Sequence, residues 1–277
     1  MTDKTFGARL WAALRERGPL CVGIDPHAAL LDAWGLPDDA SGAERFSRTV
    51  VDALAGSVAM VKPQVAFYER FGSAGIAALE RTIGDARAAG LLVLTDAKRG
   101  DIGTTAAAYA QAFLDPAGPL FSDALTVSPY LGFGSLQPFL DAAAEHGCGV
   151  FVLALTSNPE GPQVQHARGR DGRTVAGAIL ADVAAANAGA APQGSVGVVV
   201  GATIGDTAED LACNGPVLVP GLGAQGGGAA DLRRIFGPVA AHVVPAVSRE
   251  ILRAGPSTTR LRDAAAEAVE AFAAALM

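Results

Sequence analysis

Ionisable side chains recur in this chain at the points where short apolar runs end. Asp25 closes one such run, Lys62 lies at the end of the next, and Asp96 and Lys98 close the third, inside Asp-Ala-Lys-Arg-Gly-Asp at 96–101. Side chains two apart on a strand point to the same side, so Asp96 and Lys98 should face one cavity. Burying a charge is costly unless it is paired, and structural ion pairs seldom gather at the ends of consecutive strands. These positions therefore indicate a catalytic charge array.

Asp101 comes just after the third run and just before a helix-forming segment. An aspartate at such a place is more often a helix N-cap than a catalytic group, and Thr104 and Thr105 are alternative caps. Its closeness in sequence to Asp96 and Lys98 makes it a candidate for the same array.

A second candidate region lies near the end of the chain. The glycine-rich segment 220–228 follows the seventh apolar run, and the segment 248–250 follows the eighth. Glycines let the backbone approach an anion, Gln225 can donate through its amide, and Arg249 offers a bidentate fork. The loops after strands seven and eight bind phosphate in many barrels, so a phosphate site is expected here. The glycine-rich segment also matches the dinucleotide fingerprint GxGxxG, which belongs on the first βα turn of a doubly wound sheet. Six expected strands precede this segment's own strand, so a dinucleotide site is rejected.

Eight apolar, β-branched runs alternate with alanine-rich helical intervals. The expected strands are 20–25, 58–63, 91–98, 124–129, 149–156, 196–203, 216–223 and 242–248; the expected helices include about 4–17, 73–89, 103–114, 135–146, 174–188 and one led by Ser257. Runs that are apolar throughout are typical of parallel strands buried on both faces. The alternation predicts one α/β domain over 1–277, a (β/α)₈ TIM barrel, with the long connections 26–45 and 157–173 on its catalytic face.

Composition argues against several other classes of protein. The formal net charge of −7 argues against non-specific binding to nucleic acid and against a basic membrane-surface protein. Cys21, Cys148 and Cys213 form no CxxC, and no apolar leader or membrane-spanning run is visible, so a cytoplasmic location is expected. The histidines show no HxH or HExxH spacing and GxSxG is absent, which leaves a zinc site or a Ser-His-Asp hydrolase unsupported.

The segment DAKRGDI at 96–102 resembles the Asp-x-Lys-x-x-Asp signature of the orotidine 5′-phosphate decarboxylase family. Similarity to the bacterial type 2 subgroup continues through VGIDPH (22–27), VKPQVAFYERFG (61–72), VSPYLGFGSL (127–136), LTSNPEG (155–161) and VPGLGAQGG (219–227). The resemblance implies a lyase that converts orotidine 5′-monophosphate to UMP and CO₂ in the last step of de novo pyrimidine biosynthesis. It also implies that no cofactor or metal is needed, and that the chain is a homodimer with each active site at the subunit boundary.

The resemblance also implies roles for individual positions. Lys98 is similar to the proton donor, with Asp96 and Asp101 as the carboxylates beside it. The positions that resemble substrate contacts are Asp25 and Lys62 at the ribose, Ser157 and Pro220 at the pyrimidine, and Gln225, Ser248 and Arg249 at the phosphate. Asp101, Ile102 and Thr105 resemble the residues that the partner subunit supplies. Shorter relatives have glycine where this chain has Ser248, whose backbone N–H still offers a donor.

Three other functions stay open at this point. A Mg²⁺-dependent sugar-phosphate lyase of the same barrel superfamily would place a metal-binding glutamate where this chain has Lys62, and a cation there would repel Mg²⁺. A Schiff-base aldolase would need a lysine with a lowered pKa, whereas neighbouring carboxylates have the opposite effect. A non-catalytic nucleotide binder would bind without turnover, although all the charged positions are present.

Overall fold

The computed structural model describes residues 5–223 and 226–277. Eight parallel strands close into a barrel in chain order, which confirms the predicted (β/α)₈ fold. The strands are β1 (Cys21–Ile24), β2 (Met60–Pro63), β3 (Leu92–Arg99), β4 (Ala124–Val127), β5 (Gly149–Leu155), β6 (Val196–Val200), β7 (Val217–Pro220) and β8 (Val243–Val247). Pairing of Cys21 with Ala246 and of Val22 with Val247 joins β1 to β8 and closes the barrel.

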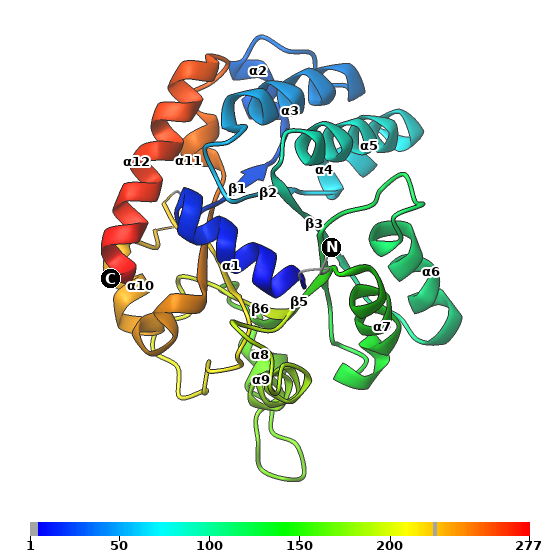
Figure 1. Cartoon of the computed structure of the whole chain (residues 1–277), viewed down its shortest axis with the longest axis vertical. Coiled ribbons are helices and arrows are strands. Elements are labelled where there is room, and N and C mark those ends of the chain that lie inside the picture. The colour runs from blue at the N-terminus through cyan, green and yellow to red at the C-terminus, as the bar shows by residue number, and fades with distance from the viewer. Residues whose placement is uncertain (1–4, 224–225) are drawn as a thin grey trace.

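Helices surround the barrel, and one helix lies across its centre in the view of Figure 1. They are α1 (Phe6–Arg17), α2 (Ala28–Ala33), α3 (Ala40–Leu54), α4 (Ala66–Glu69), α5 (Gly72–Ala88), α6 (Gly103–Leu114), η1 (Phe133–Leu136), α7 (Gln137–His146), α8 (Pro162–Gln165), α9 (Val175–Ala186), α10 (Ala229–Phe236), η2 (Gly237–His242), α11 (Arg249–Leu252) and α12 (Thr258–Leu276). Each helix expected from the sequence is present, with ends that differ by one or two residues. Among the described residues, no helix combines the length and apolar character needed to cross a membrane.

The core has two parts because each strand is buried on both faces. Outward side chains such as Val22, Val61 and Val93 pack against the helical shell. Inward side chains form a second cluster that includes Phe6 and Leu10 of α1. The Phe6 ring meets the Phe151 ring edge-on, with centroids 6.0 Å apart. Helix α1 therefore covers the amino-terminal end of the barrel and leaves the carboxyl-terminal end for a site.

The connection expected over 26–45 differs from the prediction because most of it is helical. It contains α2 and the start of α3, and the Asp39 side chain caps α3 by accepting from the Gly42 N–H at 2.9 Å. The second long connection, 157–173, has less regular structure: it contains only the single turn α8 and a bend in which Arg168 donates to the Gly172 carbonyl at 2.6 Å. The sixth and seventh strands end three residues earlier than expected, where glycines begin. Of these, Gly221 has a φ of 93°, which ends the extended conformation.

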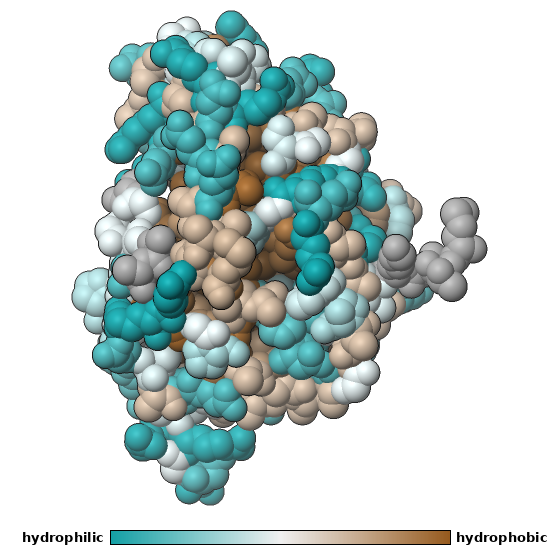
Figure 2. All heavy atoms as spheres, turned by 60° about the vertical axis from the view of Figure 1, so that its left-hand side comes forward, coloured by the Kyte–Doolittle hydropathy of each residue, from teal (hydrophilic) through white to brown (hydrophobic). Residues whose placement is uncertain are grey.

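Hydrophilic residues cover most of the upper and lower parts of the face drawn in Figure 2, and the most hydrophobic residues on it lie in recesses. This distribution fits a barrel whose apolar runs are enclosed by helices with polar outer faces.

Candidate active site

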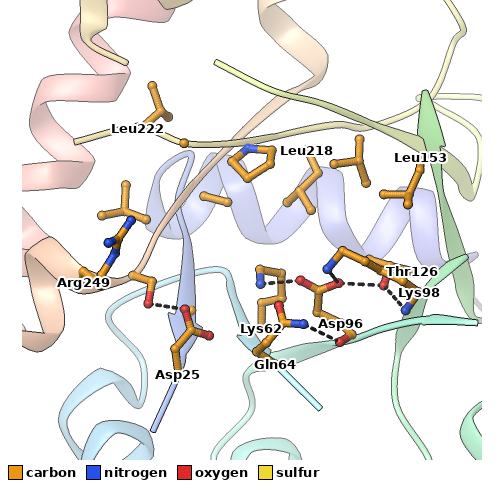
Figure 3. A pocket seen from close by; sticks show the side chains of 17 residues that line it. Asp25, Lys62, Gln64, Asp96, Lys98, Thr126, Leu153, Leu218, Leu222 and Arg249 are labelled. Atoms are coloured by element: carbon orange, nitrogen blue, oxygen red, sulfur yellow. Dashed lines mark hydrogen bonds and ion pairs between the residues drawn. The ribbon is translucent and has the colours of Figure 1, made fainter. Parts of the chain in front are cut away.

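A cavity of about 300 Å³ opens at the carboxyl-terminal end of the barrel (Figure 3). Five charged side chains line it: the carboxylates Asp25 and Asp96 and the cations Lys62, Lys98 and Arg249. All five were expected from the sequence, and Pro220 and Ser248 line the same cavity. The surplus of cations over carboxylates suits an anionic ligand.

Asp96 is the centre of the charge array. Its Oδ2 accepts from the Lys62 ammonium at 2.7 Å and its Oδ1 accepts from the Lys98 ammonium at 2.6 Å. Lys62 and Asp96 are buried, whereas the Lys98 side chain is 45% exposed. One ammonium is thus enclosed behind the carboxylate, and the other faces the cavity with room to meet a ligand.

The pKa shifts follow from this arrangement. Burial by itself would raise the pKa of Asp96, but the charges of Lys62 and Lys98 and their hydrogen bonds outweigh burial and hold that pKa well below its usual range. Burial would lower the pKa of Lys62, but Asp96 and Asp25 outweigh it and the pKa is raised. Each of the two groups therefore favours the charged form of the other.

The backbone around Lys98 departs from regular strand geometry. Lys98 has a φ of 47°, in the left-handed region that residues with a side chain seldom adopt. The register between β3 and β4 also shifts between Thr95 and Arg99. Asp96 and Lys98 do face one cavity as expected, but strand alternation alone does not explain how Lys98 reaches it.

At the end of the cavity away from Lys98, the residues that follow β1 and β8 contact each other. The Ser248 hydroxyl donates to Asp25 Oδ2 at 2.5 Å, while Asp25 Oδ1 is buried with no hydrogen-bond partner among the described residues. A Cβ on Gly23 would lie only 2.7 Å from the Ser248 Cβ, so glycine at 23 permits this approach. Arg249 follows directly on the cavity wall.

Several expected site residues do not lie in this cavity. Asp101 accepts from the Ile102 N–H at 2.8 Å, and it is Ile102, not Asp101, that occupies the N-cap position of α6. Ile102 is 62% exposed, and Thr105 is exposed on the first turn of α6. Ser157 lines a neighbouring cavity of about 380 Å³ beneath the connection 157–173. Gln225 lies outside the described residues.

Two polar residues in the cavity were missed by the sequence analysis. Thr126 donates to Asp96 Oδ1 at 2.8 Å, and Gln64 donates through its amide to the Asp96 carbonyl at 3.2 Å. The signal for Gln64 was its position two residues after Lys62, on the same side of the strand. The signal for Thr126 was a hydroxyl inside an otherwise apolar run.

Within residues 5–223 and 226–277, no three His, Cys, Asp or Glu side chains are grouped so that they could hold a metal ion.

Comparisons with known proteins agree with this geometry. Residues 18–264 match the family model described as "Orotidine 5'-phosphate decarboxylase / HUMPS family". Orotidine 5′-phosphate decarboxylases of Streptomyces coelicolor and Salinispora arenicola are 65% and 63% identical to this chain, over 94% and 95% of both sequences. A solved structure from Streptomyces avermitilis has a TM-score of 0.97 at 62% identity and covers 100% of this chain and 97% of its own. Leishmania donovani OMP decarboxylase has a TM-score of 0.76 at 31% identity and covers 98% and 99%.

Proposed function

We propose that Lys98 is the proton donor in this chain, which belongs to the orotidine 5′-phosphate decarboxylase / HUMPS family. The chain converts orotidine 5′-monophosphate to UMP and CO₂, the reaction for which its Streptomyces and Salinispora relatives are named. The single observation that carries the mechanism is the Lys62–Asp96–Lys98 array on the cavity wall, in which the Lys98 side chain is 45% exposed while those of Lys62 and Asp96 are buried.

The reaction needs a fixed positive charge beside the reacting carbon. When the bond from C6 to the carboxyl group breaks, its electron pair stays on C6 in the ring plane, where the π-system cannot delocalise it. The Lys98 ammonium stabilises this carbanion electrostatically and then gives it a proton to form the new C6–H bond. Solvent returns a proton to Lys98 after the product leaves. We propose that no cofactor takes part in these steps.

Asp96 keeps the ammonium in place during this sequence. The carboxylate is held on one oxygen by Lys62 and on the other by Thr126 and Lys98, so it cannot turn away from the cavity. Since groups fixed before the reaction need no reorganisation during it, this restraint lowers the barrier to protonation.

Substrate binding follows the order of side chains along the cavity. Figure 3 shows Arg249 and Asp25 toward one end, Lys62 and Asp96 in the middle, and Lys98 at the other end. We assign the phosphate to Arg249, the Ser248 N–H and Gln225, and the ribose hydroxyls to Asp25 and Lys62. We assign the pyrimidine to Pro220 and to Ser157, which would have to reach it from the neighbouring cavity that it lines. The unpartnered Asp25 Oδ1 supports the ribose assignment, because a buried carboxylate oxygen is stabilised by a hydroxyl donor.

We propose that the chain is a homodimer with shared active sites, in which Asp101, Ile102 and Thr105 enter the partner's cavity. Ile102 and Thr105 are exposed and Asp101 is partly exposed, and none of the three lines the cavity of its own chain, which supports this. The loop after β4 exposes Tyr130 and Leu131, which are 79% and 53% accessible, and the loop after β3 exposes Ile102, which is 62% accessible. The Ser128 N–H donates to the Arg99 carbonyl at 2.8 Å, which places the two loops side by side. Exposed apolar side chains on adjacent loops are typical of a surface that another chain covers.

We also propose that the chain forms one domain in the cytoplasm, with no nucleic-acid or membrane partner. The free and buried thiols of Cys21, Cys148 and Cys213 support a reducing location, and the net charge of −7 supports the lack of nucleic-acid binding.

Replacement of Lys98 tests the mechanism directly. We expect Lys98→Ala to lower kcat by on the order of 10⁴-fold or more, because both the stabilising charge and the proton donor are lost. Turnover is followed as the loss of the ultraviolet absorbance of the orotate nucleotide, in metal-free buffer with and without EDTA. Binding of UMP by calorimetry is the control and should remain measurable. Near-wild-type decarboxylation by Lys98→Ala would overturn the mechanism, and loss of wild-type activity in EDTA would favour the metal-dependent lyase.

Mixing two inactive variants tests the shared site. Lys98→Ala and Asp101→Ala are each expected to be inactive, but a mixed dimer contains one site with both native residues. Random equimolar assembly should therefore restore about a quarter of the native sites. The control pair is Lys98→Ala with Arg249→Ala, whose residues share one chain's cavity, so every mixed site stays defective. Full activity of Asp101→Ala alone, or no restoration in the first pair, contradicts the proposal.

A further inference from the structure

Hydrogen bonds through Thr126 and Asp96 link the backbone N–H of Lys98 to its own side-chain ammonium. Its hydroxyl accepts from the Lys98 backbone N–H at 3.0 Å and donates to Asp96 Oδ1 at 2.8 Å. The same Asp96 oxygen accepts from the Lys98 ammonium at 2.6 Å. The one hydroxyl of Thr126 therefore touches the backbone of Lys98 directly and its ammonium through a single carboxylate oxygen (Figure 3).

These hydrogen bonds lie where the ladder between β3 and β4 is interrupted. Thr95 pairs with Leu125 and Arg99 pairs with Val127, so β3 advances four residues while β4 advances two. The extra residues bulge out of the ladder, and Lys98 adopts its left-handed φ of 47° there. The Lys98 N–H is bonded by the Thr126 side chain in place of a strand carbonyl. A conformation that is costly for a lysine persists only where neighbouring groups hold it.

The Thr126 hydroxyl is shielded from bulk water. Thr126 is only 1% exposed, although it lies on the cavity wall. Without the hydroxyl, the Lys98 N–H would have no acceptor and Asp96 Oδ1 would lose a donor, and an unsatisfied buried group is costly. The bulge would relax toward a conformation that pairs the N–H elsewhere and moves the lysine.

From this geometry, and resting on the proposed role of Lys98, we infer that Thr126 is a positioning residue for decarboxylation. It fixes the left-handed backbone of Lys98 and the rotation of the Asp96 carboxylate together, so that the ammonium stays beside the reacting carbon. Thr126 reaches the chemistry only through these two groups. Its removal should therefore change the chemical step and leave substrate binding largely intact.

The test compares Thr126→Val, which keeps the shape and removes the hydroxyl, with Thr126→Ser, which keeps the hydroxyl. We expect kcat to fall on the order of 10- to 100-fold in Thr126→Val, as for the loss of hydrogen bonds to a charged group. The KM for orotidine 5′-monophosphate and the Kd for UMP should stay within about threefold. Thr126→Ser should keep kcat within about threefold of wild type, since it retains both hydrogen bonds. Exchange of the UMP C6 proton with solvent deuterium, the reverse of protonation, should slow in parallel with kcat.

Thr95→Val is the matched control. Thr95 is also a fully buried strand threonine, and its hydroxyl bonds to Ser122 at 2.5 Å, away from the cavity. It should lower the Tm by an amount similar to Thr126→Val and leave kcat and exchange unchanged. If Thr126→Val does not fold, Thr126→Ala serves as the variant without a hydroxyl, compared against Thr95→Ala.

Wild-type kcat in Thr126→Val, or an equal loss of kcat in Thr126→Ser, overturns the inference. So does a KM increase that accounts for the whole loss in kcat/KM. Failure of the positioning role of Thr126 can be distinguished from failure of the proposed role of Lys98. If Lys98→Ala is inactive and Thr126→Val is fully active, only the positioning role fails; if Lys98→Ala is active, the mechanism itself fails.

Discussion

The two ends of the barrel differ in how their buried polar groups are hydrogen-bonded. At the amino-terminal end, Arg9 donates to Asp123 at 2.6 Å, and the other oxygen of Asp123 accepts from the Val93 N–H at 3.0 Å. At the carboxyl-terminal end, Asp96 holds two ammonium groups, Asp25 Oδ1 has no partner in the described part of the chain, and Lys98 has a left-handed backbone. Both oxygens of Asp123 are satisfied within the protein, whereas Asp25 Oδ1 is available to a ligand.

The interactions at one end stabilise the fold, and those at the other arrange charges for the reaction. Helix α1 covers the amino-terminal end with apolar side chains that pack inside the barrel, which stabilises the fold. The catalytic end keeps an open cavity and a strained residue, both of which reduce stability but place charge in advance of the reaction. Changes at one end should therefore alter stability with little effect on turnover, and changes at the other should do the reverse.

Of the changes that compare the two ends of the barrel, replacement of Arg249 is expected to have the largest effect on turnover relative to its effect on stability. Arg249→Ala should lower kcat/KM by about 10²- to 10³-fold, since the proposed bidentate, charge-assisted contact to phosphate would be lost. Wild-type enzyme should also decarboxylate the phosphate-free nucleoside faster when phosphite is added, because binding of a remote dianion can drive catalysis, and Arg249→Ala should lose this activation. Steady-state kinetics and the Tm are measured together. Arg253→Ala, on an exposed residue one turn further along, is the control; equal losses in both variants would contradict a phosphate contact at Arg249.

A stability effect without a catalytic effect is expected at Phe6. Its ring is fully buried between α1 and the inside of the barrel, so Phe6→Ala should lower the free energy of unfolding by about 3–5 kcal/mol. Urea unfolding at 25 °C measures the loss, and kcat at 25 °C should equal that of wild type. A lowered kcat with unchanged stability would show that the two ends are coupled, against the comparison drawn here.

The smallest effect concerns two histidines, one at each end. Burial lowers the pKa of His242, which lies just before β8 with its Nδ1 2.9 Å from Gln193 Oε1. Burial also lowers the pKa of His27, which follows β1 on the catalytic side, and Arg249, Arg253 and Arg70 add to the shift against Asp25. A group whose pKa is lowered by folding contributes stability that is complete above its unfolded pKa, about 6.5, and is lost as the pH falls below it.

The Tm should accordingly fall by about 1–3 °C between pH 7.5 and pH 5.5. His242→Gln and His27→Gln should each remove part of this dependence, and differential scanning calorimetry at both pH values measures how much belongs to each end. A pH dependence that is unchanged in both variants would show that other groups cause it.

Much of the fold was predictable because its elements are local. Each barrel strand is a short apolar run that is recognisable without its neighbours, and the alternation of runs and helices leaves few architectures other than a barrel. The positions of Asp25, Lys62, Asp96, Lys98 and Arg249 followed for the same reason. Polar residues at the ends of parallel strands meet at one end of a closed barrel whatever fills its interior.

The short helix α2 within 26–45 was not predicted, because one or two turns carry little periodicity and form only when their apolar side, here Leu30 and Leu31, packs on the core. That Ser157 lines the neighbouring cavity was not predictable either, because the path of a long connection depends on what it packs against.

The sequence by itself determined which charged side chains gather at the catalytic end, since that depends only on the order and direction of the strands. Only the tertiary structure decided how Lys98 is held there, through a register shift, a left-handed backbone and the Thr126 hydroxyl. Strand pairing brings together residues that are 28 positions apart in the chain, and no local pattern around Lys98 specifies which side chain of the neighbouring strand will lie opposite it.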